Sequence, residues 1–244
     1  MFKNLAARRS QGTQFIRDLR AARPTGFRGR PRLDATPCGD GCTACREVCP
    51  TEAITLAPLT LDLGRCTFCA ACELACPAEK LHFSNDPRMG AADTQGLLVR
   101  EGDEPKAIAA SLHRLFGRSV RLRQVSAGGC NACELELNAT VNVNFDLQRY
   151  GIDWVASPRH ADGLVVTGPI SANMARALQL AWDAMPAPKF VIAVGACAIS
   201  GGLFREGAET ERAFLGTVAP VVYVPGCPVH PLTFAHALLD AMGR

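Results

Sequence analysis

The sequence predicts an α/β protein in which a doubly wound parallel sheet follows a smaller α+β unit. From residue 120 onward, apolar β-branched runs alternate with helical segments, which is typical of parallel strands buried on both faces. Two similar cysteine-rich stretches at residues 38–50 and 66–77 indicate the smaller unit. A chain of 244 residues is long enough for both parts to have a core.

The first part of the chain, residues 1–35, is a strongly basic extension. It carries nine Lys and Arg side chains against two Asp, a local charge of +7, whereas the whole chain carries +3. Two interpretations stay open: a solvated, partly disordered tail, or short helices that contact an anionic membrane surface or a partner subunit. The apolar side chains of such helices would be Phe2, Leu5, Phe15, Ile16 and Leu19. Nothing else in the chain is typical of a nucleic-acid-binding module.

The apolar segments favour a protein that stays in the cytoplasm. Runs such as FVIAVGACAI are far shorter than the roughly 20 residues of a membrane-spanning helix, and no apolar stretch of a secretion signal follows the start. Arg8 and Arg9 are followed by SQGTQ, which is unlike a twin-arginine signal. In the reducing cytoplasm, clustered cysteines indicate metal or redox sites rather than disulfides.

The two cysteine-rich stretches are copies of one unit. Their last three cysteines match at a constant offset of 27 residues, which a duplication explains. The first cysteine differs, because one extra residue separates Cys38 from Cys42. The first copy contains Cys38, Cys42, Cys45 and Cys49, and the second contains Cys66, Cys69, Cys72 and Cys76.

The spacing Cys-x-x-Cys-x-x-Cys-x-x-x-Cys-Pro is that of two-cluster ferredoxins, in which the fourth cysteine ligates the other cluster. Three closely spaced thiolates can wrap one corner of an iron–sulfur cube, and the proline ends the helix so that the fourth reaches the second cube. Structural zinc, the main alternative, usually uses two separated Cys-x-x-Cys pairs. We therefore assign Cys38, Cys42, Cys45 and Cys76 to one 4Fe-4S cluster, and Cys66, Cys69, Cys72 and Cys49 to the other.

These stretches resemble the 2x(4Fe-4S) ferredoxin domain. The resemblance covers residues 36–86, and short strands expected at AITL and LHF fit the small two-fold fold of that family. The extra residue after Cys38 departs from the pattern. Residues 87–119 are expected to form a linker with one amphipathic docking helix, EPKAIAASLHRLFG, ended by Gly117.

The remaining four cysteines each follow a predicted strand. Cys130 and Cys133 open a helix after SVRLRQVSAGG, Cys197 follows FVIAVG, and Cys227 follows VVYVPG. Loops at the carboxyl ends of parallel strands meet at one edge of the sheet. A single cysteine is more often a small buried hydrophobe. Four at equivalent positions, with the other eight already assigned, indicate a third 4Fe-4S cluster.

A second resemblance covers residues 120–244. The motifs GGCNACELEL, SPRHADGLVVTGP, VIAVGACAISGG and VPGCPVHP resemble the 20 kDa subunit family of NADH:quinone oxidoreductase (complex I) and of the related energy-converting [NiFe] hydrogenases. The resemblance implies a flavodoxin-like domain whose cluster lies beside a large subunit. The two-residue gap between Cys130 and Cys133 is that of the hydrogenase and formate hydrogenlyase branch. Val229 and Leu232 depart from the family's GCPPxPE ending.

The resemblance also implies roles for side chains other than cysteine. Glu136 matches the family's glutamate beside the cluster, and is expected to contact the catalytic partner or relay protons. Arg159 is a candidate for an interface contact, as is His160, for which a structural role is the simpler interpretation. The helix dipole explains Glu134 and Glu136 in a first helical turn equally well. No segment has the form of a dinucleotide-binding fingerprint.

The sequence contains no pattern of a nucleophile with its base, so the expected chemistry is electron transfer by clusters. We expect a subunit of an oxidoreductase complex that is not catalytic alone and lies peripherally on the inner face of the cell membrane. Its three 4Fe-4S clusters would exchange electrons with the large-subunit active site of an energy-converting [NiFe] hydrogenase. Two alternatives stay open. One is the same relay in a complex I-like quinone-reducing module, or in a hydrogenase relative whose partner has lost its metal; the other is a free-standing ferredoxin-type carrier or sensor.

Overall fold

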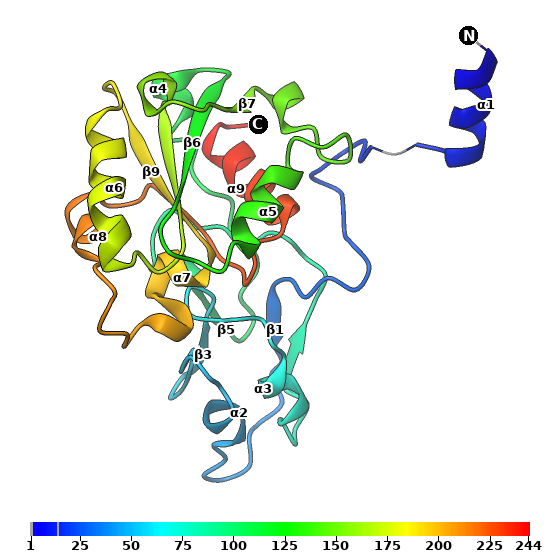
Figure 1. Ribbon diagram of the computed structural model, residues 1–244. Coiled ribbons are helices and arrows are strands. Elements are labelled where there is room, and N and C mark those ends of the chain that lie inside the picture. Colours follow the sequence, from blue (N-terminus) through cyan, green and yellow to red (C-terminus); the bar gives the residue numbers. More distant parts are fainter. Residues whose placement is uncertain (1, 14) are drawn as a thin grey trace.

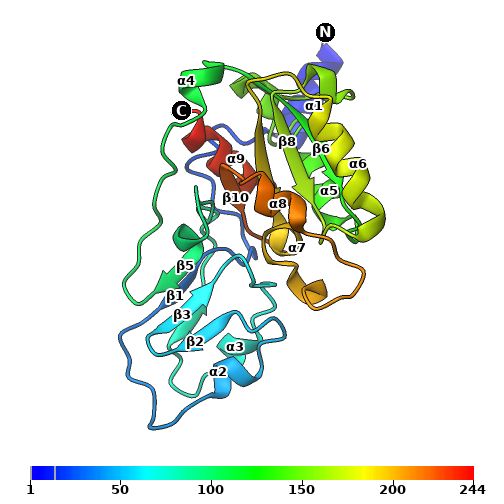
Figure 2. The same ribbon diagram turned by 90° about the vertical axis from the view of Figure 1, so that its left-hand side faces the viewer.

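The computed structural model describes residues 2–13 and 15–244; Met1, Gln14 and the side chain of Phe2, one of the predicted contact residues, lie outside this description. Two lobes are visible, a larger one built on a parallel sheet and a smaller one that holds the duplicated cysteine runs (Figures 1 and 2). None of the described helices combines the length and the hydropathy that a membrane-spanning segment needs.

The larger lobe is built on a five-stranded sheet with the order β10–β9–β8–β6–β7, in which every pairing is parallel. Counted within the lobe, this order is 2-1-3-4-5 read from one edge, which is the flavodoxin-like order of doubly wound sheets. All positions of β8 and β9 are buried, which explains their unbroken apolar runs. The predicted fold class is therefore confirmed. The strands are β6 (Val120–Ser126), β7 (Ile152–Trp154), β8 (Gly163–Thr167), β9 (Phe190–Val194) and β10 (Val222–Val224).

Helices cover both faces of this sheet (Figure 1). On one face, α5 and α9 pack with the strands into a hydrophobic core, and ten of the eleven residues of α9 are buried. On the other face, α6 and α8 contribute to a second core. The short α7 directly follows β9 at the carboxyl edge of the sheet. The helices are α5 (Ala132–Ala139), α6 (Ala172–Asp183), α7 (Gly195–Ser200), α8 (Ala213–Thr217) and α9 (Pro231–Ala241).

The smaller lobe has two small antiparallel sheets, one of β1 and β4 and the other in the order β2–β3–β5. Two one-turn helices, α2 and α3, carry cysteines into a core shared with both sheets. The strands expected at AITL and LHF are present as β2 and β4. The elements are β1 (Pro31–Leu33), α2 (Ala44–Glu47), β2 (Ile54–Leu56), β3 (Leu59–Asp62), α3 (Ala71–Leu74), β4 (Leu81–Phe83) and β5 (Leu98–Arg100).

The basic extension is separate from the body only in its first part. The helix α1 (Phe2–Gln11) stands away from both lobes (Figure 1), and its described side chains are exposed. The following segment is packed instead: the amide of Ile16 donates to the carbonyl of Asn144 at 2.9 Å, and Leu19 is fully buried in the core of the larger lobe. Residues 31–33, expected in the extension, form β1. A disordered tail over all of residues 1–35 is therefore not what the structure shows.

The docking helix expected in the linker is much shorter than predicted. Only α4 (His113–Phe116) is helical, while the residues before it run along α9 without regular structure. The amide of Ile108 donates to the Asp240 carboxylate at 3.2 Å, and that of Leu112 donates to the Ala241 carbonyl at 2.9 Å. Burial of Ile108 and Leu112 against the core together with these bonds replaces the helical hydrogen bonds.

Candidate metal centres

Three helices that carry cysteines begin in the same way. Each of α2, α3 and α5 starts with Ala-Cys, and another cysteine stands three positions before the helical one. Before α3 and α5 the intervening residue, Ala70 or Asn131, has a left-handed φ of 64° or 68°. This conformation turns the chain sharply between the two cysteines. A repeated local turn thus prepares the pairs at positions 69/72 and 130/133, whereas Thr43, at the equivalent place in the 42/45 pair, has a φ of −121°.

The first cavity of the smaller lobe is lined by the four cysteines that spacing assigns to one cluster. Its other lining residues are mostly apolar and include Leu59 and Leu81. Although Cys38 has the irregular spacing and an exposed side chain, it lies on this cavity with the others. The four are Cys38, Cys42, Cys45 and Cys76.

The second cavity is lined by the other predicted set. It takes three cysteines from the second copy and Cys49 from the first, among apolar residues such as Ile54, Leu61 and Phe83. The structure therefore brings together both crosswise sets, while their binding of iron stays a prediction. The four cysteines of this cavity are Cys49, Cys66, Cys69 and Cys72.

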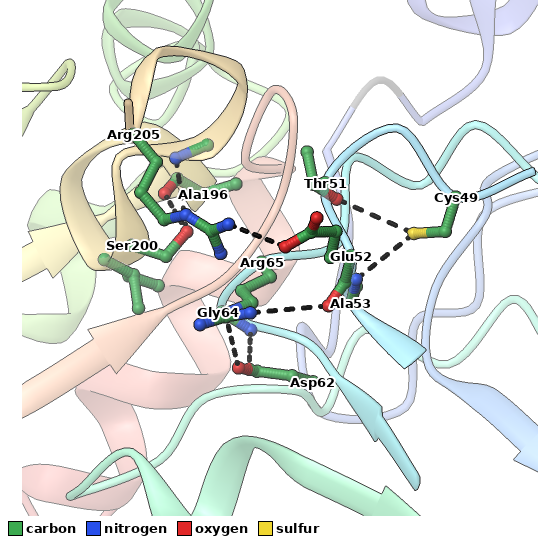
Figure 3. Close-up of polar contacts among 12 residues, drawn as sticks. Cys49, Thr51, Glu52, Ala53, Asp62, Gly64, Arg65, Ala196, Ser200 and Arg205 are labelled. Atoms are coloured by element: carbon green, nitrogen blue, oxygen red, sulfur yellow. Dashed lines mark hydrogen bonds and ion pairs between the residues drawn. The ribbon is translucent and has the colours of Figure 1, made fainter. Parts of the chain in front are cut away.

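Backbone amides are directed at the sulfur atoms of this lobe. The amide of Ala53 donates to Cys49 Sγ at 3.2 Å, and at the equivalent place in the second copy the amide of Lys80 donates to Cys76 Sγ at 3.3 Å. Figure 3 shows the Cys49 contact beside the Thr51 hydroxyl. Such donors stabilise negative charge on sulfur and tune cluster potentials.

The last four cysteines come together at the carboxyl edge of the parallel sheet, as predicted from their positions after strands. Burial, and after it the neighbouring Cys227 and Cys130, raise the pKa of Cys197 to about 11. Burial also raises the pKa of Cys133 to about 12, with smaller contributions from Glu134, Cys197 and Cys227. Each of the four thus has at least one other member of the group as an electrostatic neighbour.

Burial keeps two thiols of the second cavity, Cys66 and Cys72, in the neutral form. Burial raises the pKa of Cys66 to about 12 and that of Cys72 to about 11, so these thiols stay neutral without a metal. Iron would supply the positive charge that holds buried sulfur as thiolate. Among the described residues, no group of three or more His, Cys, Asp or Glu is arranged around a single ion. In a cube each thiolate binds its own iron atom, so a cluster and not a single ion is the relevant comparison.

The second cavity adjoins the third group of cysteines. Cys69 contributes to the raised pKa of Cys227, after burial and Cys130, and a pocket of about 270 Å³ is lined by both Cys227 and Phe68, the residue before Cys69. The segment of residues 34–43, which carries Cys38, lies at the opposite end of the smaller lobe (Figures 1 and 2). The three sets are therefore arranged in sequence from this tip to the sheet.

A surface ion pair joins the two lobes at the same boundary. Arg205, which follows α7, contacts the carboxylate of Glu52 at 2.8 Å, three residues after Cys49 (Figure 3). Closer packing lies beneath it, because a Cβ built on Gly64 would stand 2.8 Å from a side-chain carbon of Ile199 in α7. The loops of Cys49 and Cys197 are thus held side by side.

Other predicted site residues divide between the two edges of the sheet. Glu136 lines the pocket beside Cys227, and burial raises its pKa. Glu134 is buried and accepts a hydrogen bond of 2.6 Å from the Thr167 hydroxyl, which ties α5 to the end of β8. Arg159 and His160 lie in a 3-10 turn before β8, at the amino edge. The structure does not bring these two to the cysteines.

Two residues near the third group were not predicted from the sequence. Gly195 has a φ of +85°, and a Cβ there would stand 2.7 Å from Cys133 Sγ. Its place directly before Ala-Cys at a strand end was an available signal. Arg212 donates to the carbonyl of Cys197 at 3.0 Å, and no local pattern pointed to this contact between distant segments.

Comparisons with known proteins place the larger lobe in a family. The family described as NADH ubiquinone oxidoreductase, 20 Kd subunit, matches residues 130–241. The chain is 40% identical over 136 residues to the probable membrane-bound hydrogenase subunit mbhJ of Pyrococcus furiosus, covering 55% of this chain and 81% of that protein. It is also 40% identical over 162 residues to formate hydrogenlyase subunit 7 of Escherichia coli, covering 64% and 62%.

A third relative comes from the quinone branch. An NADH-quinone oxidoreductase subunit of Desulfovibrio desulfuricans is 48% identical over 117 residues, covering 48% of this chain and 61% of that protein. A solved membrane-bound sulfane sulfur reductase shares 23% identity over 52% of this chain and 73% of its own, with a TM-score of 0.43 that is too low to add to this. By identity and coverage, this chain belongs to the family of the 20 kDa subunit of NADH ubiquinone oxidoreductase.

Proposed function

We propose that this chain is the electron-transfer subunit of a membrane-bound oxidoreductase complex and holds three 4Fe-4S clusters in a relay. The observation that carries this proposal is the division of all twelve cysteines into three sets of four. When bound, such clusters accept and release single electrons. The ferredoxin-like role of the smaller lobe is part of the proposal.

The chain itself would supply ligands, burial and hydrogen bonds. Cavities lined by Leu81 in one case and Phe83 in the other would limit water around the sulfur atoms. The amides of Ala53 and Lys80 would stabilise the charge of the crosswise ligands. The smaller lobe would therefore present its thiolates in largely apolar and partly preorganised sites.

The positions of the three cysteine sets support an order of electron transfer along the molecule. Cys69 and Cys227 are electrostatic neighbours, so the second cavity would exchange electrons with the third group. The first cavity, near the tip of the smaller lobe, would then face an external donor or acceptor. The sheet edge would face the large subunit, and Glu136 in the pocket beside Cys227 would contact that subunit or exchange protons with it.

The hydrogenase branch is the first candidate for the complex. The two-residue gap between Cys130 and Cys133 supports it, as do relatives named as hydrogenase and formate hydrogenlyase subunits. The partner would then be the large subunit of an energy-converting [NiFe] hydrogenase. The 48% identity to the NADH-quinone oxidoreductase subunit favours a complex I-like module as the second candidate.

We also propose a peripheral position on the inner face of the cell membrane. The exposed helix α1 carries Lys3, Arg8 and Arg9 and no acidic side chain, a charge that would suit anionic lipid headgroups. Its exposed Leu5 would enter the interface. Binding of α1 to a partner subunit instead would leave the relay unchanged.

Anaerobic purification of the native complex with metal analysis tests the proposal. We expect this chain, after subtraction of the iron held by its partners, to account for about twelve irons and three separate reducible clusters by EPR, with nickel in the partner if the hydrogenase branch is correct. About eight irons per chain would remove the third cluster and the relay with it. A monomer without any partner would favour a free-standing carrier.

A further inference from the structure

Arg212 lies where the loop after β8 meets α7. It comes immediately before α8 and is half-buried. Its guanidinium donates to the carbonyl of Pro169 at 3.2 Å and to three carbonyls of α7. These three are Cys197 at 3.0 Å, Ala198 at 2.7 Å and Ile199 at 3.0 Å.

These bonds serve the loop that carries a cysteine of the third group. The last carbonyls of a helix lack full partners within the helix, and Arg212 donates to three of those in α7. The Cys197 carbonyl also accepts from the amide of Gly201 at 2.9 Å, so the guanidinium is its second donor. Because one of them belongs to Cys197 itself, the guanidinium fixes the backbone at this residue. It also ties that backbone to the end of β8.

The charge of Arg212 has no carboxylate partner among the residues that the structure describes. Burial lowers its pKa, and the one neighbouring titratable group that raises it is the Cys197 thiol. Neutral carbonyls satisfy the N–H groups but do not compensate a buried positive charge. Arg205, a short distance along the chain, differs because it is paired with Glu52 and Glu206.

We propose that Arg212 is a positioning residue for the third cluster and that its fixed positive charge raises the reduction potential of that cluster. This inference rests on the proposed function. When one electron passes from the second cluster to the third, the second is oxidised by one electron and the third is reduced by one. The third cluster as a whole would then carry one more negative charge, and the guanidinium beside Cys197 would stabilise this reduced state relative to the oxidised one.

The test uses EPR redox titration of the complete, anaerobically purified complex. In Arg212→Gln, which keeps a hydrogen-bond donor but loses the charge, we expect the ratio of reduced to oxidised third cluster at a fixed potential to fall about tenfold. For one electron this is a downward shift of about 59 mV. Arg212→Lys keeps the charge without the planar fork, so its potential stays close to that of the wild type. The matched control Arg205→Met removes a paired charge from the same segment and leaves the potential unchanged.

Two results would overturn the inference alone: a wild-type potential in Arg212→Gln, or an equal downward shift in Arg212→Lys. If Arg212→Gln loses the EPR signal of the third cluster, the reduction potential of that cluster in Arg212→Lys decides. In Arg212→Lys, a reduction potential close to that of the wild type then supports the proposed effect of the positive charge, and a lowered potential overturns it. Wild-type protein with about eight irons would instead overturn the proposed function, and this inference with it.

Discussion

In the smaller lobe, each set of cysteines comes from two short runs of chain, whereas the set at the sheet edge is drawn from loops spread over residues 130–227. The cavities of the smaller lobe depend on short turns and on the Pro-ended fourth position, which are local features. The third group depends on three strands of one sheet delivering their following loops to one edge. The comparison shows that a group of four cysteines can be brought together by local sequence in one lobe and by tertiary structure in the other.

The strongest test of the local encoding is the substitution Cys76→Ala. Since Cys76 lines the first cavity and not the second, we expect loss of about four irons per chain and of the cluster held by the first cysteine run. The cluster held mainly by the second run should persist, although Cys76 belongs to that run. Iron analysis with EPR measures both effects.

The matched variant for this test is Cys49→Ala, which should give the opposite result. Loss of the second-run cluster in Cys76→Ala, with retention of the first-run cluster, would contradict crosswise ligation. The third group should be unaffected in either variant.

The tertiary encoding is tested by Gly195→Ala. The new Cβ would stand 2.7 Å from Cys133 Sγ at a φ of +85°, and strain of this kind costs about 1–3 kcal/mol. We expect loss of the third cluster, with the smaller lobe's clusters retained, by iron analysis and EPR. In the control Gly216→Ala, nothing lies within 4 Å of the new atom, so iron content stays the same. Equal iron loss from both lobes in Gly195→Ala would contradict the conclusion that the two lobes assemble their cysteine sets independently.

Alkaline pH should affect both lobes of the iron-free protein alike. Burial raises the pKa of Cys66 and of Cys133 to about 12, from an ordinary value of 9.0. The folded state thus favours neutral thiols, and its stability is fully present below about pH 9 and falls as unfolded chains ionise above it. Denaturant unfolding between about pH 7 and 11 measures this decline.

Alkylation of the same iron-free protein separates the two lobes. The exposed Cys38 and Cys130 should react first. The buried Cys66 and the half-buried Cys133, whose pKa values are both raised to about 12, should stay protected at about pH 9. Rapid alkylation of Cys133 with Cys66 still protected would indicate that the sheet edge opens on its own.

The smallest effect is expected from Glu52→Gln at the boundary between the lobes. Glu52 pairs with Arg205 at 2.8 Å, but its side chain is 75% exposed, and exposed pairs contribute little at physiological salt. The thermal unfolding midpoint should therefore be unchanged at about 0.15 M salt. A large drop would mean that this pair, and not the packing of Gly64 against Ile199, holds the lobes together.

Segments with strong local patterns were predicted well. The apolar runs at residues 163–167 and 190–194 became buried parallel strands, and the family resemblance of the larger lobe was confirmed by its relatives. The conformations of segments 16–19 and 104–112 were not predicted correctly, because they depend on partners elsewhere in the chain. Ile108, for example, is held by Asp240, and local sequence cannot indicate a contact with the C-terminal helix.

The sequence by itself determined the two sets of thiols in the smaller lobe and where strands and helices alternate, because cysteine spacing and apolar periodicity act within a few residues. Only the tertiary structure decided that the second cavity adjoins Cys227, that Arg212 reaches the Cys197 backbone, and that Arg159 lies at the opposite edge of the sheet. These relations join residues far apart in the chain. They arise when burial of two hydrophobic cores brings distant loops together.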